Sequence, residues 1–416
     1  MKKHVEVLVT GGNHRAGLAV ARSLAEHGVS FLIVGEERHS FSFHSRYVKN
    51  ALVSPSPIER PEEFFQFILS TVRKHNIQLI IPVGEEPLII FNQHREEIEK
   101  HARLAMASSP SLKKVLDKRI NLEIARQLGI PCPKQFELKG LNQIPEMIET
   151  LGLPIVLKPP GSRHHPELPS FPFKVIYAHD ESQLRRYIDE YCRDQEFPIF
   201  QECATGVIHN LCCFAARGET VAIHEYHSLR RMRGNGVLRR VVELLPEAEQ
   251  AARNILRALE WDGVAHVAFF VNHLSNKLYY METNGRLWSS VEGSIHAGWD
   301  FPYWIYRYFL HGCKPVTIPI RLGSRTCWHR GDLMALMIYL LGGEIPATGT
   351  NPGRIRAVFQ YLSGFNPMIH SDVFRLRDPV PAVIDHWNLV KEAFQMLREL
   401  KTVDQANLFS SPTKKK

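Results

Sequence analysis

Hydrophobic positions in the first quarter of the chain follow two alternating periods. Continuous apolar runs at residues 5–9, 29–34 and 77–83 are typical of buried strands. The stretches between them, such as residues 61–75, carry the i, i+3, i+4 spacing of amphipathic helices. Strands that alternate with helices favour a mostly parallel sheet. The sequence therefore predicts an α/β class, with an open parallel-sheet domain over residues 1–109.

Two loops of this domain follow predicted strands. Residues 11–17 begin Gly-Gly and precede a helix that runs to about His27, and residues 84–86 read Gly-Glu-Glu. Ligands bind at the carboxyl ends of parallel strands, so both loops are candidate substrate contacts, and ordinary turn chemistry explains either equally well. The first loop lacks the Gly-x-Gly-x-x-Gly fingerprint, so a nicotinamide site that uses Glu36 is the less favoured alternative.

After residue 110 the order of elements changes, with strands close to one another in sequence. Ser111 is expected to cap a helix that ends before Gly129, and Lys118 lies opposite the apolar stripe of that helix. Strands are predicted at residues 153–158, 198–202, 211–216, 220–224, 263–272 and 278–288, with a helix at 246–259. Neighbouring strands of this kind indicate an α+β core.

The strand at residues 278–288 ends in three polar side chains at every second position. Glu282, Asn284 and Arg286 are predicted to share one face of the sheet, because side chains on a strand alternate between faces. Carboxylate and amide oxygens suit Mg²⁺, and a guanidinium binds phosphate or carboxylate. The triplet fits a metal-bound polyphosphate, and a solvated strand end with an incidental ion pair is the open alternative.

Lys158 closes the apolar run of residues 153–158 just before a turn, so it is predicted to project toward whatever the next loop covers. Lysine is a common phosphate binder. The loop from Ser162 to Phe173 is polar, contains three prolines and is interpreted as a flexible lid over a ligand. Lys118, taken alone, is expected to be a solvated lysine.

Composition then excludes several classes of protein. The chain has 416 residues, a formal net charge of +8 and 44% hydrophobic residues, which is typical of a globular protein of several packed units. It contains no run long enough to cross a bilayer and no signal-peptide pattern, so a cytoplasmic protein with no membrane partner is expected. The seven cysteines lack Cys-x-x-Cys spacing and are predicted to be free thiols. The clustered arginines at 230–240 lack interleaved aromatics, so no nucleic-acid partner is expected.

The ordered set of motifs resembles the ATP-grasp superfamily, and is most similar to its carboxylate-amine ligase and carbamoyl-phosphate-synthase-like members. The set comprises a lysine on a helix before Leu-Gly-Ile-Pro, a lysine in Pro-Ile-Val-Leu-Lys-Pro, a Gln-Glu strand end, an arginine-rich segment, Gly-Val-Ala and Met-Glu-Thr-Asn-Gly-Arg. The resemblance covers about residues 4–310, and the N-terminal α/β unit corresponds to the domain that precedes the ATP-grasp fold.

The resemblance implies a nucleotide site. Lys118 and Lys158 would contact the phosphates of ATP, and the strand that ends at Gln201 and Glu202 would line the adenine pocket. His209 falls where such enzymes hold the ribose.

The same resemblance implies a metal site and a reaction. Glu282 and Asn284 would ligate Mg²⁺, while Arg286 and Arg231 would steady the transferring phosphoryl group or the substrate carboxylate. Such proteins activate a small carboxylate as an acyl phosphate, which an amine then attacks to form an amide or peptide bond. Lysines, arginines and Mg²⁺ supply the positioning and charge neutralisation that phosphoryl transfer needs.

One departure concerns the metal site. The family places an acidic metal ligand on the strand before the final hairpin, but residues 266–280 contain no Asp or Glu, and Ala268 or Phe270 takes that position. Asn272 or Glu243 completes the shell, or a single Mg²⁺ is bound tightly, or activity is lost. The last possibility gives the alternative function, a degenerate ATP-grasp protein that binds nucleotide without turnover.

The expected domain boundaries follow from these motifs. Residues 110–198 would form the small ATP-grasp subdomain, residues 199–315 the large one, and residues 316–416 a C-terminal appendage that packs on the core or makes a homodimer contact. In the appendage Asp332 is predicted to cap a helix, and a final amphipathic helix is predicted from about Val380 to Leu400. Arg325 and His329 are assigned a structural role in preference to one in the active site.

Overall fold

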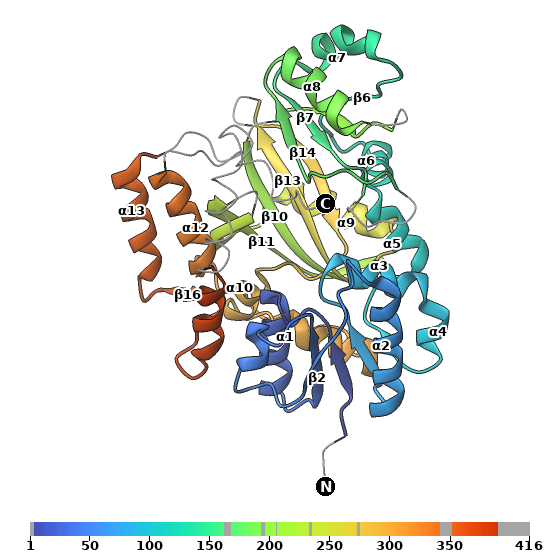
Figure 1. The fold of residues 1–416 in the computed structure, drawn as a ribbon, viewed down its shortest axis with the longest axis vertical. Coiled ribbons are helices and arrows are strands. Elements are labelled where there is room, and N and C mark those ends of the chain that lie inside the picture. The colour runs from blue at the N-terminus through green and yellow to red at the C-terminus, as the bar shows by residue number, and fades with distance from the viewer. Residues whose placement is uncertain are drawn as a thin grey trace.

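Three sheets organise the part of the chain that the structure describes. The structure is a computed structural model, and it describes residues 4–161, 168–192, 196–204, 206–232, 235–272, 275–341 and 352–389. Figure 1 shows the N-terminal sheet at one end of the molecule, a four-stranded sheet with its helices at the other end, and a seven-stranded sheet between them.

The N-terminal sheet is parallel, as the strand-helix alternation predicts. Its strand order is β3-β2-β1-β4-β5, and every neighbouring pair runs parallel. The strands are β1 (Val7–Val9), β2 (Phe31–Gly35), β3 (Ala51–Val53), β4 (Leu79–Ile81) and β5 (Arg103–Leu104). The helices are α1 (Arg15–Glu26), η1 (Phe41–His44), α2 (Pro61–His75), α3 (Glu85–Gln93) and α4 (Arg95–Glu99). Helix α2 has the predicted bounds, because proline and acidic residues begin it and basic residues end it.

The helix predicted between Ser111 and Gly129 is two helices, α5 (Ser109–Leu116) and α6 (Lys118–Gln127). Asp117 lies between them in an extended conformation and caps α6, because its carboxylate accepts a hydrogen bond of 2.8 Å from the backbone N–H of Arg119. The predicted cap at Ser111 was wrong: the Ser108 hydroxyl caps α5 and accepts from the N–H of Ser111.

The four-stranded sheet is antiparallel, in the order β6-β9-β7-β8. Its elements are β6 (Gln135–Phe136), η2 (Leu141–Gln143), α7 (Ile144–Leu151), β7 (Ile155–Lys158), β8 (Ile176–Ala178), α8 (Glu181–Tyr191) and β9 (Ile199–Glu202). Because β9 pairs with β7, the two sheets divide the chain between Glu202 and Gly206, later than the predicted boundary at residue 198. Within the predicted lid, residues 162–167 lie outside the described residues, and Phe171 and Phe173 are buried in the core of this sheet.

The seven-stranded sheet has the order β14-β13-β10-β11-β12-β15-β16. Its pairs are antiparallel except for β15 and β16. The elements are β10 (Gly206–Ala216), β11 (Glu219–Met232), β12 (Asn235–Val242), α9 (Pro246–Ala258), β13 (Gly263–Asn272), β14 (Leu278–Asn284), β15 (Arg325–Cys327) and β16 (Ile369–Ser371). The strand β13 has its predicted bounds, whereas β14 ends at Asn284, so Arg286 lies beyond the strand on which it was predicted.

Alternate residues of β10, β11 and β13 pack against different layers. One face joins the core that contains α9, through Leu211, Cys213, Ile223, Val267, Phe269, Ala252 and Ile255. The other face joins the core that contains the aromatic helix α11 (Phe301–His311), through Cys212, Phe214, Ala222, Val264, Phe301 and Ile305. Successive residues along each of these strands therefore point to opposite faces of the sheet and pack into different cores.

The C-terminal part adds α10 (Val291–His296), α12 (His329–Leu340), α13 (Arg354–Leu362) and η3 (Ser363–Phe365). Asp332 was wrongly predicted as a helix cap. Trp328 is the N-cap of α12, and Asp332 is buried in that helix, where it accepts a 2.9 Å hydrogen bond from Nε of Arg230. Residues 380–389 are helical, and the rest of the predicted final helix lies outside the described residues.

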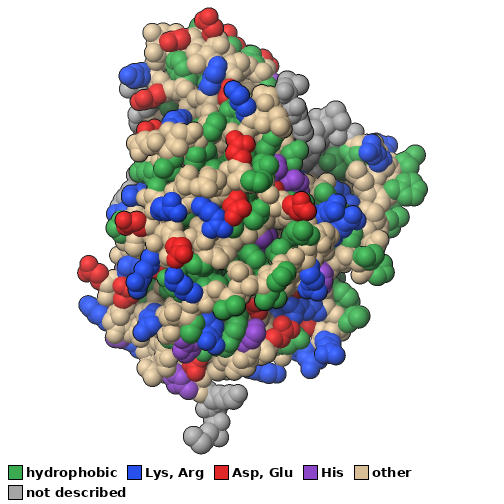
Figure 2. Space-filling model, turned by 180° about the vertical axis from the view of Figure 1, so that it is seen from behind, with side chains coloured by type: hydrophobic (Ala, Val, Ile, Leu, Met, Phe, Trp, Pro, Cys, Tyr) green, Lys and Arg blue, Asp and Glu red, His purple; other side chains and the backbone are tan. Residues whose placement is uncertain are grey.

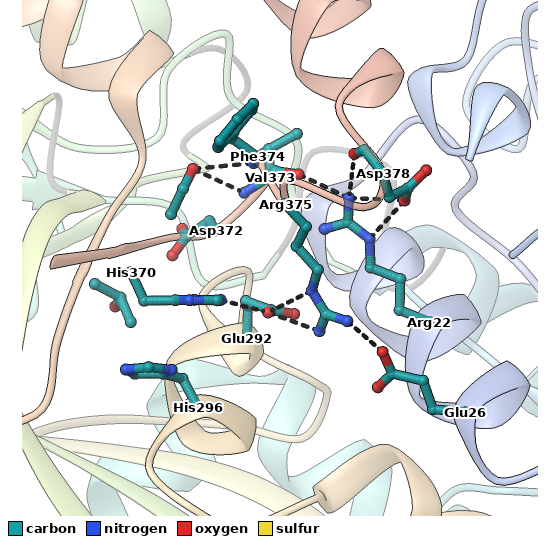
Figure 3. Close-up of polar contacts among 12 residues, drawn as sticks. Arg22, Glu26, Glu292, His296, His370, Asp372, Val373, Phe374, Arg375 and Asp378 are labelled. Atoms are coloured by element: carbon teal, nitrogen blue, oxygen red, sulfur yellow. Dashed lines mark hydrogen bonds and ion pairs between the residues drawn. The ribbon is translucent and has the colours of Figure 1, made fainter. Parts of the chain in front are cut away.

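Buried ion pairs fasten this C-terminal part to the N-terminal helix α1. The fully buried Arg22 donates to Asp378 at 2.9 Å and to the carbonyl of Val373 at 2.8 Å (Figure 3). One oxygen of Glu292, on α10, accepts hydrogen bonds from Arg375 at 2.8 Å and from His370 at 2.9 Å. Burial opposes ionisation of Glu292, but these two partners lower its pKa below the ordinary value.

The face seen in Figure 2 carries positive and negative side chains in an interspersed arrangement. Hydrophobic side chains gather at the edge formed by the C-terminal helices, where Ile355, Phe359 and Leu362 of α13 are more than half exposed. No helix within the described ranges is long and apolar enough to cross a membrane.

We expect Glu292→Gln to lower the free energy of unfolding by about 3 kcal/mol, because Arg375 keeps its charge and loses its buried counter-charge. Urea unfolding followed by tryptophan fluorescence measures this change. Glu63→Gln is the matched control, because the Arg60–Glu63 pair is exposed and should contribute less than about 1 kcal/mol. Equal effects of the two variants would contradict a stabilising role for the buried pair.

Candidate functional site

The polar end of β14 is built as the strand period predicts, as far as Asn284. Glu282 and Asn284 lie on the same face, and Nδ2 of Asn284 donates a 2.9 Å hydrogen bond to Oε1 of Glu282. On the neighbouring strand β13, Ala268 lies opposite Glu282 and His266 lies opposite Asn284. These four side chains face the side of the sheet away from α9.

Glu282 is held in its charged form by its surroundings. Burial opposes ionisation, but the hydrogen bond from Asn284 and the positive charges of Lys118 and Lys158 together lower the pKa of the carboxyl below its ordinary value. The two lysines that stabilise this carboxylate also suit a polyphosphate, because a polyphosphate carries a larger negative charge than one carboxylate.

Lys158 belongs to the other sheet, and its positive charge acts on this carboxylate. It is the last residue of β7, and its Nζ donates a 2.7 Å hydrogen bond to Oε1 of the buried Gln201 on β9. Burial lowers the pKa of Lys158, and the charge of Glu282 acts in the opposite direction. The structure thus brings Lys158, Gln201 and Glu282 together from two different sheets.

Lys118 approaches from a third element. It is the first residue of α6, and its backbone N–H donates a 2.8 Å hydrogen bond to the carbonyl of Pro160, which follows β7. The helix start, fixed by the Asp117 cap, is therefore attached to the segment that carries Lys158.

Glu202 links the end of β9 to the segment before β6. Its carboxylate accepts a 2.8 Å hydrogen bond from the backbone N–H of Lys134, and its own N–H donates to the carbonyl of Lys134. These bonds place the residues before β6 beside the end of β9.

Two arginines border the site on different sides. Nε of Arg286 lies 3.7 Å from Oε2 of Glu85, in the loop at residues 84–86 that the sequence singled out. Arg231, on β11, is half buried, and burial lowers its pKa. Arg231 lines a cavity of about 330 Å³, together with Arg230, Asp332, Tyr339 and Tyr361 among others, between the start of β10, the end of β11 and the helices α12 and α13.

His209 faces the opposite side of the sheet from Glu282. It pairs with Phe269 on β13 and His227 on β11, whose positions share the α9 face. Its Nδ1 lies 2.6 Å from Oε1 of Glu225, a buried carboxylate. Burial opposes ionisation of Glu225, but hydrogen bonds from His209 and His227 lower its pKa to about 2.

Sequence reasoning missed His266, which lies two residues before Ala268 on the face that carries Glu282. Burial lowers the pKa of His266 to about 4, against the opposing charge of Glu282. Its Nε2 lies 3.3 Å from the hydroxyl of Tyr226. The two-residue period of β13 was visible in the sequence and already placed His266 on the face of Ala268.

The residues present fit a single Mg²⁺ at Glu282 and Asn284. One ionised carboxylate and one amide oxygen are hard ligands, and Mg²⁺ usually keeps several waters or phosphate oxygens as well. Opposite Glu282, the buried methyl group of Ala268 offers no ligand, so this pair of strands supplies one carboxylate only.

Comparison with known proteins gives a low sequence similarity and a clear structural one. No protein-family model matches the chain. The carbamoyl phosphate synthase large chain of Rubrobacter xylanophilus is 20% identical over 288 residues, which make up 65% of this chain and 26% of that protein. The match thus spans about a quarter of that relative.

Three solved structures illustrate the structural similarity. The biotin carboxylase domain dimer of Hydrogenobacter thermophilus 2-oxoglutarate carboxylase, bound to MgADP and bicarbonate, has a TM-score of 0.62 and 14% identity over 78% of this chain and 74% of that one. N5-carboxyaminoimidazole synthetase of Staphylococcus aureus with ADP has a TM-score of 0.60 and 14% identity, covering 82% and 87%. The L-amino acid ligase of Bacillus licheniformis has a TM-score of 0.57 and 14% identity, covering 75% of each chain.

We expect Asp117→Ala to cost about 1 kcal/mol of stability and to weaken ADP binding as well, because Asp117 fixes the start of the helix that begins at Lys118. Asp180→Ala is the matched control. Asp180 caps α8 in the same way, through the N–H of Gln183 at 2.7 Å, but α8 packs on the far sheet core. Calorimetric titration with ADP separates the two variants, and an equal loss of affinity in both would contradict a positioning role for Asp117.

Proposed function

Because the chain has the fold of the ATP-grasp superfamily, we propose that it is an ATP- and Mg²⁺-dependent ligase that joins a small carboxylate, such as an amino acid, to an amine. The observation that carries the proposal is Glu282, to which Asn284 donates a 2.9 Å hydrogen bond and whose charged form the positive charges of Lys118 and Lys158, from two other elements, favour. A site of this charge pattern suits a polyphosphate with its divalent cation.

In the proposed complex the two lysines contact the phosphates of ATP. The end of β9, with Gln201 and Glu202, lines the adenine pocket. His209, expected from the resemblance at the ribose, faces the other side of the sheet from Glu282 and is therefore left out of the proposed nucleotide contacts. Glu282 and Asn284 hold Mg²⁺, which supplies neutralisation of phosphate charge when it is bound.

The proposed reaction uses charge and position, with no covalent bond to the protein. The carboxylate oxygen of the substrate attacks the terminal phosphoryl group, ADP leaves, and the amine then displaces phosphate from the acyl phosphate. Lys158 keeps its ammonium near the transferring group because Glu282 and Gln201 hold it in place. Arg286 and Arg231 are proposed to steady the phosphoryl group or the substrate carboxylate, for which a guanidinium has matching geometry.

The test is ADP release from Mg·ATP across a matrix of amino-acid and small carboxylate donors with amine acceptors. We expect ADP only with particular pairs, and a loss of at least about 100-fold in kcat for Lys158→Ala and for Glu282→Gln. Lys139→Ala and Glu137→Gln are matched controls, because both side chains are exposed in another part of the chain. ADP release that is equal in all four variants would contradict the assignment of the site.

A second candidate function, nucleotide binding without turnover, is favoured by one specific observation. Ala268, one of the two positions at which the resemblance leads us to expect a second acidic metal ligand, is 4% exposed and lies directly opposite Glu282. A site with one carboxylate binds Mg²⁺ less strongly than a site with two, so loss of the acid is compatible with loss of catalysis.

The substitution Ala268→Glu distinguishes the two functions. If the chain is a ligase with a single-Mg²⁺ site, the added carboxylate should give no gain in kcat, and it should destabilise the protein in EDTA because it faces Glu282. Mg²⁺ should then restore the melting temperature. Ala268→Gln controls for side-chain size without the charge. A gain in ADP release of tenfold or more, specific to Ala268→Glu, would support the decayed site instead.

A further inference from the structure

A cluster of three potential metal ligands lies on the α9 face of the seven-stranded sheet, away from Glu282. It consists of His209 on β10 with Glu225 and His227 on β11. The distances are 2.6 Å from His209 Nδ1 to Glu225 Oε1, 2.9 Å from His227 Nε2 to the same oxygen, and 3.3 Å between the two nitrogens.

The strand register explains why these atoms converge. Glu225 and His227 are two residues apart on β11, so they share a face, and His209 is the cross-strand partner of His227. The two imidazole rings meet edge to face at 4.6 Å between centroids. Neither histidine position alone predicts this convergence, which depends on the pairing of the two strands.

Hydrogen bonds satisfy only part of the triangle formed by His209 Nδ1, His227 Nε2 and Glu225 Oε1. The carboxylate accepts, so each imidazole must donate to the same oxygen from its own N–H. The two ring nitrogens that lie 3.3 Å apart then both carry hydrogen and have no acceptor between them. A single cation at the centre of the triangle would be contacted by the lone pairs of all three atoms.

The geometry points to a binding site for a divalent transition-metal ion, with Zn²⁺ as the preferred occupant, held by His209 Nδ1, His227 Nε2 and Glu225 Oε1. Tetrahedral bonds of about 2.0–2.2 Å place ligand atoms about 3.3–3.5 Å apart. The separation of the two nitrogens already has this value, and the carboxylate oxygen would retreat by roughly half an ångström. Imidazole ligands favour Zn²⁺ over Mg²⁺, which prefers oxygen.

The surroundings of the cluster fit a metal site with an open position. The second oxygen of Glu225 accepts a 2.9 Å hydrogen bond from the backbone N–H of Leu245, just before α9, which orients the carboxylate as outer partners of metal ligands do. The Glu225 side chain is 1% exposed, whereas His209 and His227 are 12% and 28% exposed, so an ion can reach the nitrogens from solvent. Arg240 lies across from His227 on β12 and opposes the cation, but its side chain is exposed and therefore screened.

Such an ion would join three neighbouring segments. It would link β10 to β11 directly and, through Glu225 and Leu245, hold the start of α9 against the sheet. A fourth ligand from solvent or from a bound molecule would complete the tetrahedron.

The experiment uses the full chain without an affinity tag, stripped with a chelator and dialysed against Zn²⁺, with bound metal measured by mass spectrometry. We expect one equivalent of Zn²⁺ in the wild type, and a loss of affinity of at least about 100-fold in His227→Asn and in His209→Asn. Co²⁺ should give the visible absorption of a site with imidazole ligands, and this absorption should disappear in both variants.

His179→Asn is the matched control, because His179 is an exposed histidine between β8 and α8. It should keep the full equivalent of Zn²⁺. Both test histidines are partly exposed, so their variants should fold, and circular dichroism checks this. The proposal is overturned if the wild type retains no more Zn²⁺ than the double variant His209→Asn/His227→Asn, or if the His179 variant loses as much metal as the other two.

Discussion

Buried guanidinium groups that require carboxylates determine how the parts of the chain are assembled. Arg15 and Arg22 of α1 are 9% and 0% exposed, and Arg239 of β12 is 3% exposed. Their counter-charges, Asp372 and Asp378, both come from the C-terminal part. Because an unpaired buried charge costs several kcal/mol, these pairs fix the N-terminal helix, the seven-stranded sheet and the C-terminal segment in one arrangement.

The sequence predicts the fold well where local signals agree with the final packing. The parallel N-terminal sheet, α2 (Pro61–His75) and β13 (Gly263–Asn272) follow from hydrophobic period and caps. Local signals fail where tertiary contacts decide. Asp332 resembles a cap in sequence. In the structure its carboxylate is buried and accepts a hydrogen bond from Arg230, which lies 102 residues earlier in the chain. The helix α13 (Arg354–Leu362) was not predicted; Pro352 and Gly353 come just before it, and Gly364 and Pro367 just after it.

The candidate site is predictable to the extent that it lies on single strands. The face shared by Glu282 and Asn284 follows from a two-residue period, and the roles of the site residues stay predictions. By contrast, the approach of Lys158 to Gln201 and the convergence of His209 with Glu225 depend on which strands pair and in which register. Register is set by the hydrophobic pattern of the whole sheet, which no short motif contains.

The ion pairs between α1 and the C-terminal segment also affect the order in which the chain can fold during synthesis. Arg15 and its partner Asp372 are separated by 357 residues, and Arg22 and Asp378 by 356. On the ribosome, where N-terminal domains emerge first, the parallel sheet would present these arginines to solvent until the segment with Asp372 and Asp378 has been translated. Before the C-terminal segment packs on it, α1 therefore exposes charged, hydrated side chains on the face that later becomes buried. These charges oppose aggregation of the nascent chain.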